Sequence, residues 1–573
     1  MHILFLTHSF PPEVNASHSH TLDQCREWVR QGQRVTIITC NTRRLWQTQE
    51  IDGIRVIQVC RSIPAISVIA ALFVSKVDVV VGTSPHSLTG LGAWIVSLFK
   101  RRPLIVEARA GLPGPVELFL YRRAFRIVSV TDAFKENLVA HGVKGSKIHV
   151  LATEVDLALK MLEVLRGIRI LILNQAFWPD VVATAQHADD LARFMVAHGD
   201  DVTVVASRAI YGERGSSLPK REVRATIEIY RVGLQLFGKG GIASRVFDFT
   251  LFYLAAAWRC LILPRHDVVI CFTTPPFIAL VGVALKWIKG TRVVYWTMDL
   301  YPDVAGALGL MKRGTLLWRV LQWIDRLCLR HSDRVVALGQ CMKRIVIAKG
   351  ARPESVRTIC VWSGAETIAD RPRAHNPLRT DWRIGDRFTI LYLGNFGLGH
   401  DMEAIAGAVE RLKENDAIRW LFIGEGKSKH ILEERVRACS ATNVIVKGYQ
   451  TREQLADVLD VGDSHLVTLQ LGWDGLILPS KFFSVLAASK PVLWVGPSGS
   501  ECVTILREHR CGFEIAVGDS RELTERIQFL ISHEAEAHAM GKRGRVAYDS
   551  KYSVQRACEQ WRGVLHDVTK ARR

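Results

Sequence analysis

The sequence has none of the cysteine patterns that hold a metal ion or form a redox-active disulfide. Its twelve cysteines are scattered over 573 residues, and no two of them stand in a C-x-x-C pair. Zinc sites and thiol redox motifs depend on such close spacing, so neither class is indicated. Scattered cysteines are typical of small buried apolar residues in a reducing compartment.

Long uncharged apolar runs are also missing. The most apolar stretches, 63–74, 249–258 and 275–285, are all shorter than the ~18 residues that a membrane span needs. The opening MHILFLTHSFPPE has no basic segment and only a short apolar run, unlike a signal peptide, so we expect a cytoplasmic protein. Stretch 249–258, between Arg245 and Arg259, is compatible with a helix in the membrane interface and equally with a buried helix.

Acidic residues are too few to balance the basic ones. The chain has 75 Lys and Arg against 56 Asp and Glu, a net charge of +19. Such an excess favours anionic partners, such as acidic phospholipids or phosphorylated small molecules. There is no basic arm and no aromatic-and-glycine signature of an RNA-binding platform, so nucleic acid is not predicted as a partner.

What the chain does have is a repeat. HILFLTHSFPPEVNASHSHTLDQCREWVRQGQRVTIITC (2–40) aligns without a gap with RILILNQAFWPDVVATAQHADDLARFMVAHGDDVTVVAS (169–207). Each copy starts with an apolar run, turns at a Phe-x-Pro-acid sequence, continues into a helix and passes a glycine (Gly32, Gly199) into a second apolar strand. This is the opening of a doubly wound α/β domain, present twice.

The repeat resumes further along and sets the predicted domain boundaries. DVVVGT (78–83) matches DVVICF (267–272), and later segments match as well, 103–114 with 292–303 and 125–142 with 333–350. The first copy is shorter and has no counterpart for anything after about residue 370. We predict a shortened copy at 1–156, a linker at 157–166, and two further domains at 167–370 and 371–573.

Residues 371–573 are predicted to form another Rossmann-like domain, which follows the one at 167–370. After the Arg/Pro-rich stretch 370–377, a strand at 388–393 leads into the glycine loop 394–399 and a helix, and further strands are predicted at 418–423, 444–446, 465–469, 491–495 and 513–516. Two such domains in tandem place a cleft at the carboxyl ends of their parallel strands. The final amphipathic helix, 552–568, is expected to pack back across the domain pair.

Three motifs of this region indicate an anion site. The loop GNFGLGH (394–400) lies between a strand and a helix, where glycines let backbone amides approach an anion; it is equally compatible with a plain turn. GEG (424–426) is a second turn at a strand end. In GWDGLILPSK (472–481), Lys481 stands at a helix start, against the helix dipole, which favours a partner such as phosphate over a surface lysine.

Together these segments resemble a known family. Residues 167–573 are similar to family 4 glycosyltransferases of the GT-B fold, in the subgroup that builds bacterial O-antigen, colanic acid and other exopolysaccharides. The resemblance is carried by a set of segments that spans nearly all of this region: NQAFWPDVVATAQ (174–186), YWTMDLYPDVAGALG (295–309), LYLGNFGLGHDMEAI (391–405), FIGEGKSK (422–429), GYQTREQL (448–455) and GWDGLILPSK…KPVLWVGPSGSE (472–501).

The resemblance implies two facing Rossmann-like domains, preceded here by an extra, partial Rossmann-like copy that we interpret as non-catalytic. It implies a retaining transfer of a sugar from a nucleotide-diphosphate donor, such as a UDP-sugar, to a lipid-linked or glycan acceptor. It also implies a protein that lies peripherally on the anionic inner face of the cytoplasmic membrane. No metal or other cofactor is implied, because amides, helix dipoles and basic side chains stabilise the leaving diphosphate.

The resemblance also implies roles for particular residues. Asp299 and Lys481 are the expected catalytic residues, Asp299 as a polar or proton-accepting group. The expected donor-binding residues are Gly394, Asn395, Gly397, Glu425, Asp474, Ser480, Lys481, Ser500 and Glu501, and those on the acceptor side are Asp180, Thr184 and Gln186.

Within residues 167–573 the chain departs from the family pattern at three positions. The two glutamates that relatives often carry eight positions apart are replaced by Leu476 and Ser484, and Asp474 is a possible substitute for the first. Met298 stands where many relatives have a catalytic histidine. In the first copy, Ala110 takes the place of Asp299. Two alternative functions therefore stay open: a non-catalytic sugar-nucleotide-binding or scaffold protein of polysaccharide assembly, and a sugar-nucleotide epimerase on the same fold.

Overall fold

The structure is a computed structural model, and it describes most of the chain. The residues outside the description are 9, 11–15, 43–45, 61–64, 85–86, 101, 109–112, 130, 144, 151–166, 211–216, 234–241, 364–372, 452–453 and 571–573. The predicted linker 157–166 and Ala110 lie outside the described residues. The chain divides into two compact units: Met1–Arg169 with the short segments 193–202 and 223–228, and the remainder up to Arg573.

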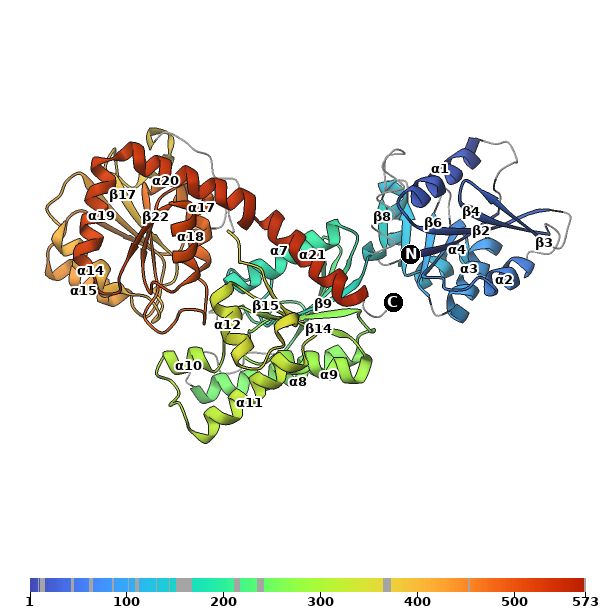
Figure 1. The fold of residues 1–573 in the computed structure, drawn as a ribbon, viewed down its shortest axis with the longest axis horizontal. Helices are drawn as coiled ribbons and strands as arrows, with labels where there is room; N and C mark the ends of the chain where they lie inside the picture. The colour runs from blue at the N-terminus through green and yellow to red at the C-terminus, as the bar shows by residue number, and fades with distance from the viewer. Residues whose placement is uncertain are drawn as a thin grey trace. The chain divides into compact units, whose positions relative to one another are not determined.

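The first unit contains an eight-stranded sheet of order β3-β4-β2-β1-β5-β6-β7-β8, drawn in blue shades in Figure 1. Neighbouring strands of this sheet are parallel except β3 and β4, which are antiparallel. The strands are β1 (His2–Thr7), β2 (Arg34–Thr42), β3 (Trp46–Ile51), β4 (Ile54–Cys60), β5 (Val79–Ser84), β6 (Leu104–Ala108), β7 (Arg126–Ser129) and β8 (Ile148–Val150). The helices are α1 (Ala16–Arg30), α2 (Ala65–Leu72), α3 (Ser87–Lys100), α4 (Pro115–Arg123), α5 (Asp132–Ala140) and the short η1 (Gly145–Lys147).

The second sheet also has eight strands, in the order β11-β12-β10-β9-β13-β14-β15-β16. The strands are β9 (Arg169–Leu173), β10 (Asp201–Ser207), β11 (Arg221–Arg224), β12 (Ile227–Val232), β13 (Val268–Cys271), β14 (Arg292–Thr297), β15 (Arg334–Ala337) and β16 (Val356–Thr358). The helices are α7 (Ala183–Ala197), α8 (Ile242–Ile262), α9 (Ala279–Lys289), α10 (Asp303–Ala307), α11 (Leu316–His331), α12 (Gln340–Ala348) and η2 (Pro353–Ser355).

The two sheets share one strand order, since each strand of the first has a counterpart in the second. In both, the glycine before the second strand, Gly32 or Gly199, has a positive φ that a residue with a side chain rarely adopts. The sequence predicted an abbreviated first copy, and the shortening lies in the connections: α2 has eight residues where α8 has 21.

The third sheet has six strands in the order β19-β18-β17-β20-β21-β22, and all neighbouring strands are parallel. Its strands are β17 (Phe388–Leu393), β18 (Ile418–Ile423), β19 (Val444–Lys447), β20 (Ser464–Thr468), β21 (Val492–Val495) and β22 (Gly512–Ile515). The helices are η3 (Arg373–His375), α13 (Pro377–Asp381), α14 (Met402–Arg411), α15 (Lys429–Ala438), α16 (Leu455–Val461), α17 (Ser480–Ala487), α18 (Glu501–His509), α19 (Ser520–Ser532), α20 (Glu534–Ala547), η4 (Tyr548–Tyr552) and α21 (Val554–Lys570).

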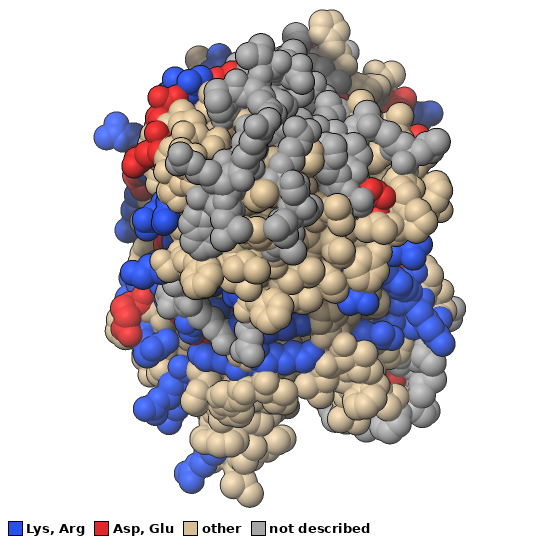
Figure 2. All heavy atoms as spheres, turned by 90° about the vertical axis from the view of Figure 1, so that its right-hand side faces the viewer, with Lys and Arg blue, Asp and Glu red and all other residues tan. Residues whose placement is uncertain are grey.

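The excess of basic residues is visible on the surface. On the face shown in Figure 2, lysine and arginine side chains outnumber aspartate and glutamate. All twelve cysteines are free, and seven of them are buried, as expected for small apolar residues. Among the described residues, no helix has the length and apolar character needed to cross a membrane.

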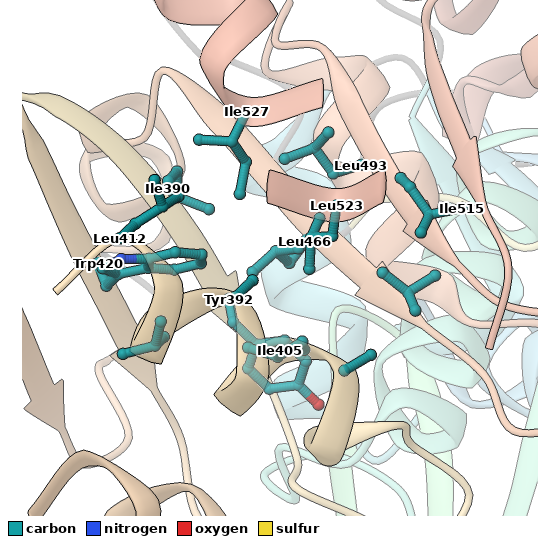
Figure 3. Close-up of a cluster of buried hydrophobic side chains, with 14 of the residues drawn as sticks. Ile390, Tyr392, Ile405, Leu412, Trp420, Leu466, Leu493, Ile515, Leu523 and Ile527 are labelled. Atoms are coloured by element: carbon teal, nitrogen blue, oxygen red, sulfur yellow. The ribbon is translucent and has the colours of Figure 1, made fainter. Parts of the chain in front are cut away.

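Alternating side chains on the strands build the cores. On β1, Ile3 and Phe5 point into one apolar cluster while Leu4 and Leu6 join another on the opposite face of the sheet. In the third sheet the strands pack against α14 and α19, and Figure 3 shows the contributing side chains, such as Ile390, Trp420 and Ile527. Burial on both faces explains why these strands read as continuous apolar runs.

The last helix joins the second and third sheets. Trp561 of α21 is fully buried, and its ring centroid lies 4.5 Å from that of Trp296 on β14. Trp296 also lies beside Trp362, whose indole Nε1 donates to Asp190 at 3.0 Å. The C-terminal segment therefore belongs to the core under the second sheet, although its sequence follows the third.

Candidate functional site

Two glycine turns meet where β17 and β18 end. A Cβ on Gly424 would lie 2.1 Å from the carbonyl oxygen of Gly394, and one on Gly426 would lie 2.4 Å from that of Phe396. Gly394, Gly424 and Gly426 all have positive φ. Any side chain at Gly424 or Gly426 would collide with backbone, so the pair of turns depends on glycine for its shape.

The loop 394–399 presents backbone amides at this strand end. The amides of Gly394 and Phe396 donate to Ile423 and Glu425 carbonyls. By contrast, those of Asn395, Gly397, Leu398 and Gly399 have no hydrogen-bond partner among the described residues. Four unbonded donors on one short loop are suited to bind an anion.

The helix that follows this loop is already capped. Asp401 accepts a hydrogen bond from the amide of Ala404 at 3.1 Å and another from Gly518 at 2.7 Å. The sequence suggested that the start of this helix would favour a ligand anion, but an aspartate of the chain occupies that position. Anion binding at this point therefore depends on the loop amides and on a nearby cation.

That cation is Lys481, the second residue of α17. Its Nζ donates to the Tyr392 hydroxyl at 3.0 Å and lies 4.3 Å from the centroid of the Tyr392 ring. A Cβ on Gly394 would lie 3.3 Å from the same Nζ, so the amine stands beside the glycine loop. Burial lowers the pKa of Lys481 to about 7. Within the described residues Lys481 forms no ion pair, and its charge has no counterion there.

Two further predicted donor residues border the same loop. Asn395 lies between the turns, because a Cβ on Gly426 would be 2.5 Å from its Oδ1 and one on Gly397 would be 3.7 Å from its Nδ2. The Glu425 carboxylate pairs with Lys429 Nζ at 2.9 Å on the exposed side of the turn. The structure thus brings together Gly394, Asn395, Gly397, Glu425 and Lys481.

Asp299 lies just after β14, and the residue that follows it contacts Leu476. Its backbone amide donates to Thr273 Oγ1 at 3.2 Å, and the next amide, that of Leu300, donates to the Leu476 carbonyl at 3.0 Å. Burial raises the pKa of Asp299 to about 6. A partly buried carboxylate with a raised pKa and no ion pair among the described residues is a candidate for a functional group.

Ser500 and Glu501 have structural partners. Ser500 caps its own helix by accepting from the amide of Val503 at 3.3 Å. Glu501 Oε2 accepts from the amide of Gln340 at 2.7 Å and so caps α12, whose own N-cap residue is a glycine. A small recess opens beside them, lined by Leu338, Gly339, Cys341, Met342, Leu469, Gly475, Ile477, Leu478, Pro479, Trp494, Ser500, Glu501 and Cys502.

Ser480 and Asp474 do not line this recess, but each is next in sequence to a residue that does, Pro479 and Gly475. Ser480 begins α17 directly after Pro479, and Asp474 precedes Gly475 and forms an isolated bridge with Ile477. A Cβ on Gly475 would lie 2.7 Å from Ile345 of α12. The donor-binding roles of Asp474, Ser480, Ser500 and Glu501 stay predictions.

The predicted acceptor-side residues hold the loop after β9. Asp180 Oδ1 accepts from the Val182 amide at 3.2 Å, and Gln186 Nε2 donates to the Val181 carbonyl at 2.7 Å. The carbonyl of Thr184 accepts from Asn174 at 3.4 Å. These contacts shape the loop, and a role toward an acceptor stays a prediction.

Comparison with known proteins decides the family. The model of the glycosyl transferase 4-like domain matches residues 15–154 and 182–362, together more than half of the chain, and that of glycosyl transferases group 1 matches residues 377–547. The chain belongs to the family 4 glycosyltransferases. The resemblance seen in the sequence is thereby confirmed, and the chain is a glycosyltransferase.

Curated relatives agree with this family. The chain is 27% identical over 314 residues to the "Probable glycosyltransferase WbjE" of Pseudomonas aeruginosa, and the match covers 53% of this chain and 75% of the relative. It is 24% identical over 332 residues to the "Putative colanic acid biosynthesis glycosyl transferase WcaI" of Escherichia coli (strain K12), and that match covers 56% of this chain and 81% of the relative.

Solved structures agree with the predicted GT-B fold. HepE of Anabaena in complex with UDP-glucose has a TM-score of 0.52 at 15% identity, covering 70% of this chain and all of HepE. WaaG, a glycosyltransferase involved in lipopolysaccharide biosynthesis, also has a TM-score of 0.52 at 15% identity, covering 69% of this chain and 99% of WaaG. At this identity the likeness concerns the fold alone.

The glycosyltransferase site also contains residues that the sequence did not single out. Tyr392 supports Lys481 through its hydroxyl and ring, and Asp401 caps the helix after the glycine loop. At one of the two departures from the glutamate pattern, Ser484 Oγ lies 3.2 Å from Ser363 Oγ. A buried tyrosine in a strand reads as core from the sequence, so only its contact with Lys481 identifies it.

Proposed function

We propose that this glycosyltransferase moves a sugar from a nucleoside-diphosphate sugar to a lipid-linked acceptor in cell-surface polysaccharide biosynthesis, with retention at the anomeric carbon. The observation that carries the proposal is Lys481, an amine without a described counterion, beside a loop with four unbonded amides. A diphosphate would supply the missing negative charge. The known binding of UDP-glucose to the similarly folded HepE supports a UDP-sugar as donor.

In the proposed reaction, the bond between the anomeric carbon and the diphosphate oxygen breaks and a bond to the acceptor oxygen forms. Negative charge then develops on the departing diphosphate, where Lys481 and the amides of loop 394–399 stabilise it. The proton of the acceptor hydroxyl passes to a phosphate oxygen or to Asp299, which is largely ionised at neutral pH because its pKa is about 6. The amine and the amides perform the work of a metal, so we propose that none is required.

We further propose that the enzyme works as a peripheral protein on the inner face of the cytoplasmic membrane. Helices α8, α9 and α11 expose Trp258, Trp287 and Trp323, each more than 60% accessible. The described acidic side chains of these helices, Asp248 and Asp325, are buried. Exposed tryptophans on a basic surface favour the interface of an anionic membrane.

The test uses the full-length enzyme, a panel of radiolabelled nucleotide sugars and bacterial membranes, with label measured in the lipid fraction. We expect label from one donor, persistence of activity in excess EDTA, and loss of label by at least about 100-fold in Lys481→Ala. Lys551→Ala, an exposed lysine paired with Glu508 outside the site, is the matched control. Release of free sugar without transfer would favour an epimerase or hydrolase instead, and binding without turnover would favour the scaffold alternative.

A further inference from the structure

The first module, residues 1–150, exposes large apolar side chains on two adjacent helices. Ile69 and Leu72 of α2, Phe73 after it, and Leu98 and Phe99 of α3 are all exposed, Phe73 and Phe99 by more than 70%. The opposite faces of both helices are buried: Ala70 and Val96, for example, belong to the core under the sheet. Contiguous exposed apolar residues on a folded module indicate a surface that meets something other than water.

The second module exposes the same positions. In the register that aligns Asp78 with Asp267, the five residues of the first module correspond to residues of α8 and α9 that are all exposed: Trp258, Leu261, Ile262, Trp287 and Ile288. By contrast, the same register replaces Asp299 by Ala110, so the first copy has lost the candidate catalytic carboxylate but kept the apolar surface.

A lysine fixes the helix pair in the same way in both modules. Lys100 Nζ donates to the carbonyls of Leu72 and Val74 at 3.0 and 2.7 Å, at the end of α2. Its counterpart Lys289 donates to the carbonyls of Cys260 and Leu263 at 3.0 and 2.5 Å, at the end of α8. The apolar residues are therefore presented on equivalent frameworks.

The charged residues around the exposed apolar side chains of α2 and α3 indicate what kind of partner this surface binds. Lys76, Arg102, Arg122 and Arg123 are exposed beside the helices, whereas Glu117 is the single acidic residue of α2, α3 and α4 and is partly buried. Apolar and aromatic side chains surrounded by basic ones suit the headgroup region of an anionic bilayer. A bilayer can also bind two similar surfaces of one chain at the same time, here that of α2 and α3 and that of α8 and α9.

We propose that α2 and α3 of the first module form a second membrane-docking surface, equivalent to that of α8 and α9. The inference rests on the membrane contact of the proposed function and adds a role for the module that lacks a donor-binding half. Because both surfaces belong to one chain, binding by one raises the effective concentration of the other at the membrane. The first module would then strengthen membrane residence without taking part in catalysis.

The test measures co-sedimentation of the full-length chain with vesicles of phosphatidylcholine, with and without phosphatidylglycerol. The paired substitutions Leu98→Asp with Phe99→Asp should weaken partitioning into the anionic vesicles by about tenfold or more. Val139→Asp, an exposed apolar residue on α5 of the same module, is the matched control and should leave partitioning unchanged. Transfer to a water-soluble acceptor should stay unchanged in all these variants, and circular dichroism checks their folding.

The variant pair Trp287→Asp with Ile288→Asp separates this inference from the proposed function. If that pair weakens vesicle binding while the Leu98 and Phe99 pair does not, the second docking surface is refuted and the membrane contact of α8 and α9 stands. If neither pair has an effect, both membrane statements fail. If Leu98→Asp with Phe99→Asp instead lowers the molar mass of the protein measured by light scattering, the surface binds another copy of the chain and the inference is overturned.

Discussion

The protonation state of Lys481 should make the binding of the nucleotide donor weaker as the pH rises above 7. Burial lowers the pKa of this lysine from 10.5 to about 7 in the free enzyme, and a bound diphosphate would raise the pKa again. Above pH 7 the free amine is therefore mostly neutral and must take up a proton when the nucleotide binds. Affinity should fall as pH rises above 7, although the nucleotide itself keeps its charge.

The size of this change in affinity follows from the fraction of the Lys481 amine that is protonated at each pH. With a pKa of about 7 the amine is half protonated at pH 7 and about one per cent protonated at pH 9. UDP should thus bind up to about 50-fold more weakly at pH 9 than at pH 7, or about 2.3 kcal/mol. At pH 8, binding should take up about 0.9 proton per site.

Titration calorimetry of UDP in two buffers of different ionisation enthalpy measures this uptake directly. Lys481→Arg, which stays charged at every pH in question, should bind with little pH dependence and no proton uptake. Constant affinity of the unmodified enzyme between pH 7 and 9 would refute the argument. The stability of the free enzyme should depend on pH in the opposite direction. Between pH 7 and about 10 the Lys481 amine is protonated in the unfolded chain but mostly neutral in the folded one. The free energy of unfolding should therefore rise by about 2 kcal/mol from pH 7 to 9.

Three further predictions concern other parts of the site. Asp299→Asn should abolish transfer yet raise the melting temperature at pH 7, because the native pKa of about 6 means that folding penalises the ionised carboxylate by up to about 3 kcal/mol; unchanged stability would contradict this burial. Gly424→Ala should prevent folding or cost more than about 3 kcal/mol in a urea melt, whereas Gly499→Ala, with no atom within 4 Å of the added carbon, should be nearly neutral. Glu501→Ala should lower stability by about 1 kcal/mol through loss of the α12 cap; a raised Kd for UDP with unchanged stability would instead assign Glu501 to the donor.

Much of the third domain could be predicted from local patterns. The strands expected at 388–393 and 418–423 coincide with β17 and β18, and that expected at 444–446 differs from β19 by one residue. Apolar runs bounded by glycine turns are strong signals, since a strand buried on both faces needs apolar residues throughout. The final helix, expected at 552–568, is found two residues later at Val554–Lys570.

The partners of the site residues could not be predicted in the same way. Glu501 and Lys481 both follow glycine- or proline-containing turns in the sequence. In the structure, however, Glu501 caps a helix more than 150 residues away in the chain, whereas Lys481 lies beside Tyr392. Asp180 and Gln186 hold their own loop through contacts that depend on how the backbone turns there. Side-chain partners that are distant in sequence carry no periodic signal.

The sequence by itself determined that the chain carries two related α/β modules and a third sheet, and it identified the family, because hydrophobic periodicity and glycine positions are local properties of the chain. The tertiary structure alone decided that Lys481 lies against Tyr392, that Asp401 occupies the start of the helix after the glycine loop, and that the two modules present matching apolar surfaces. Burial and proximity set the charge and the exposure of a side chain, and both exist only once distant segments have packed together.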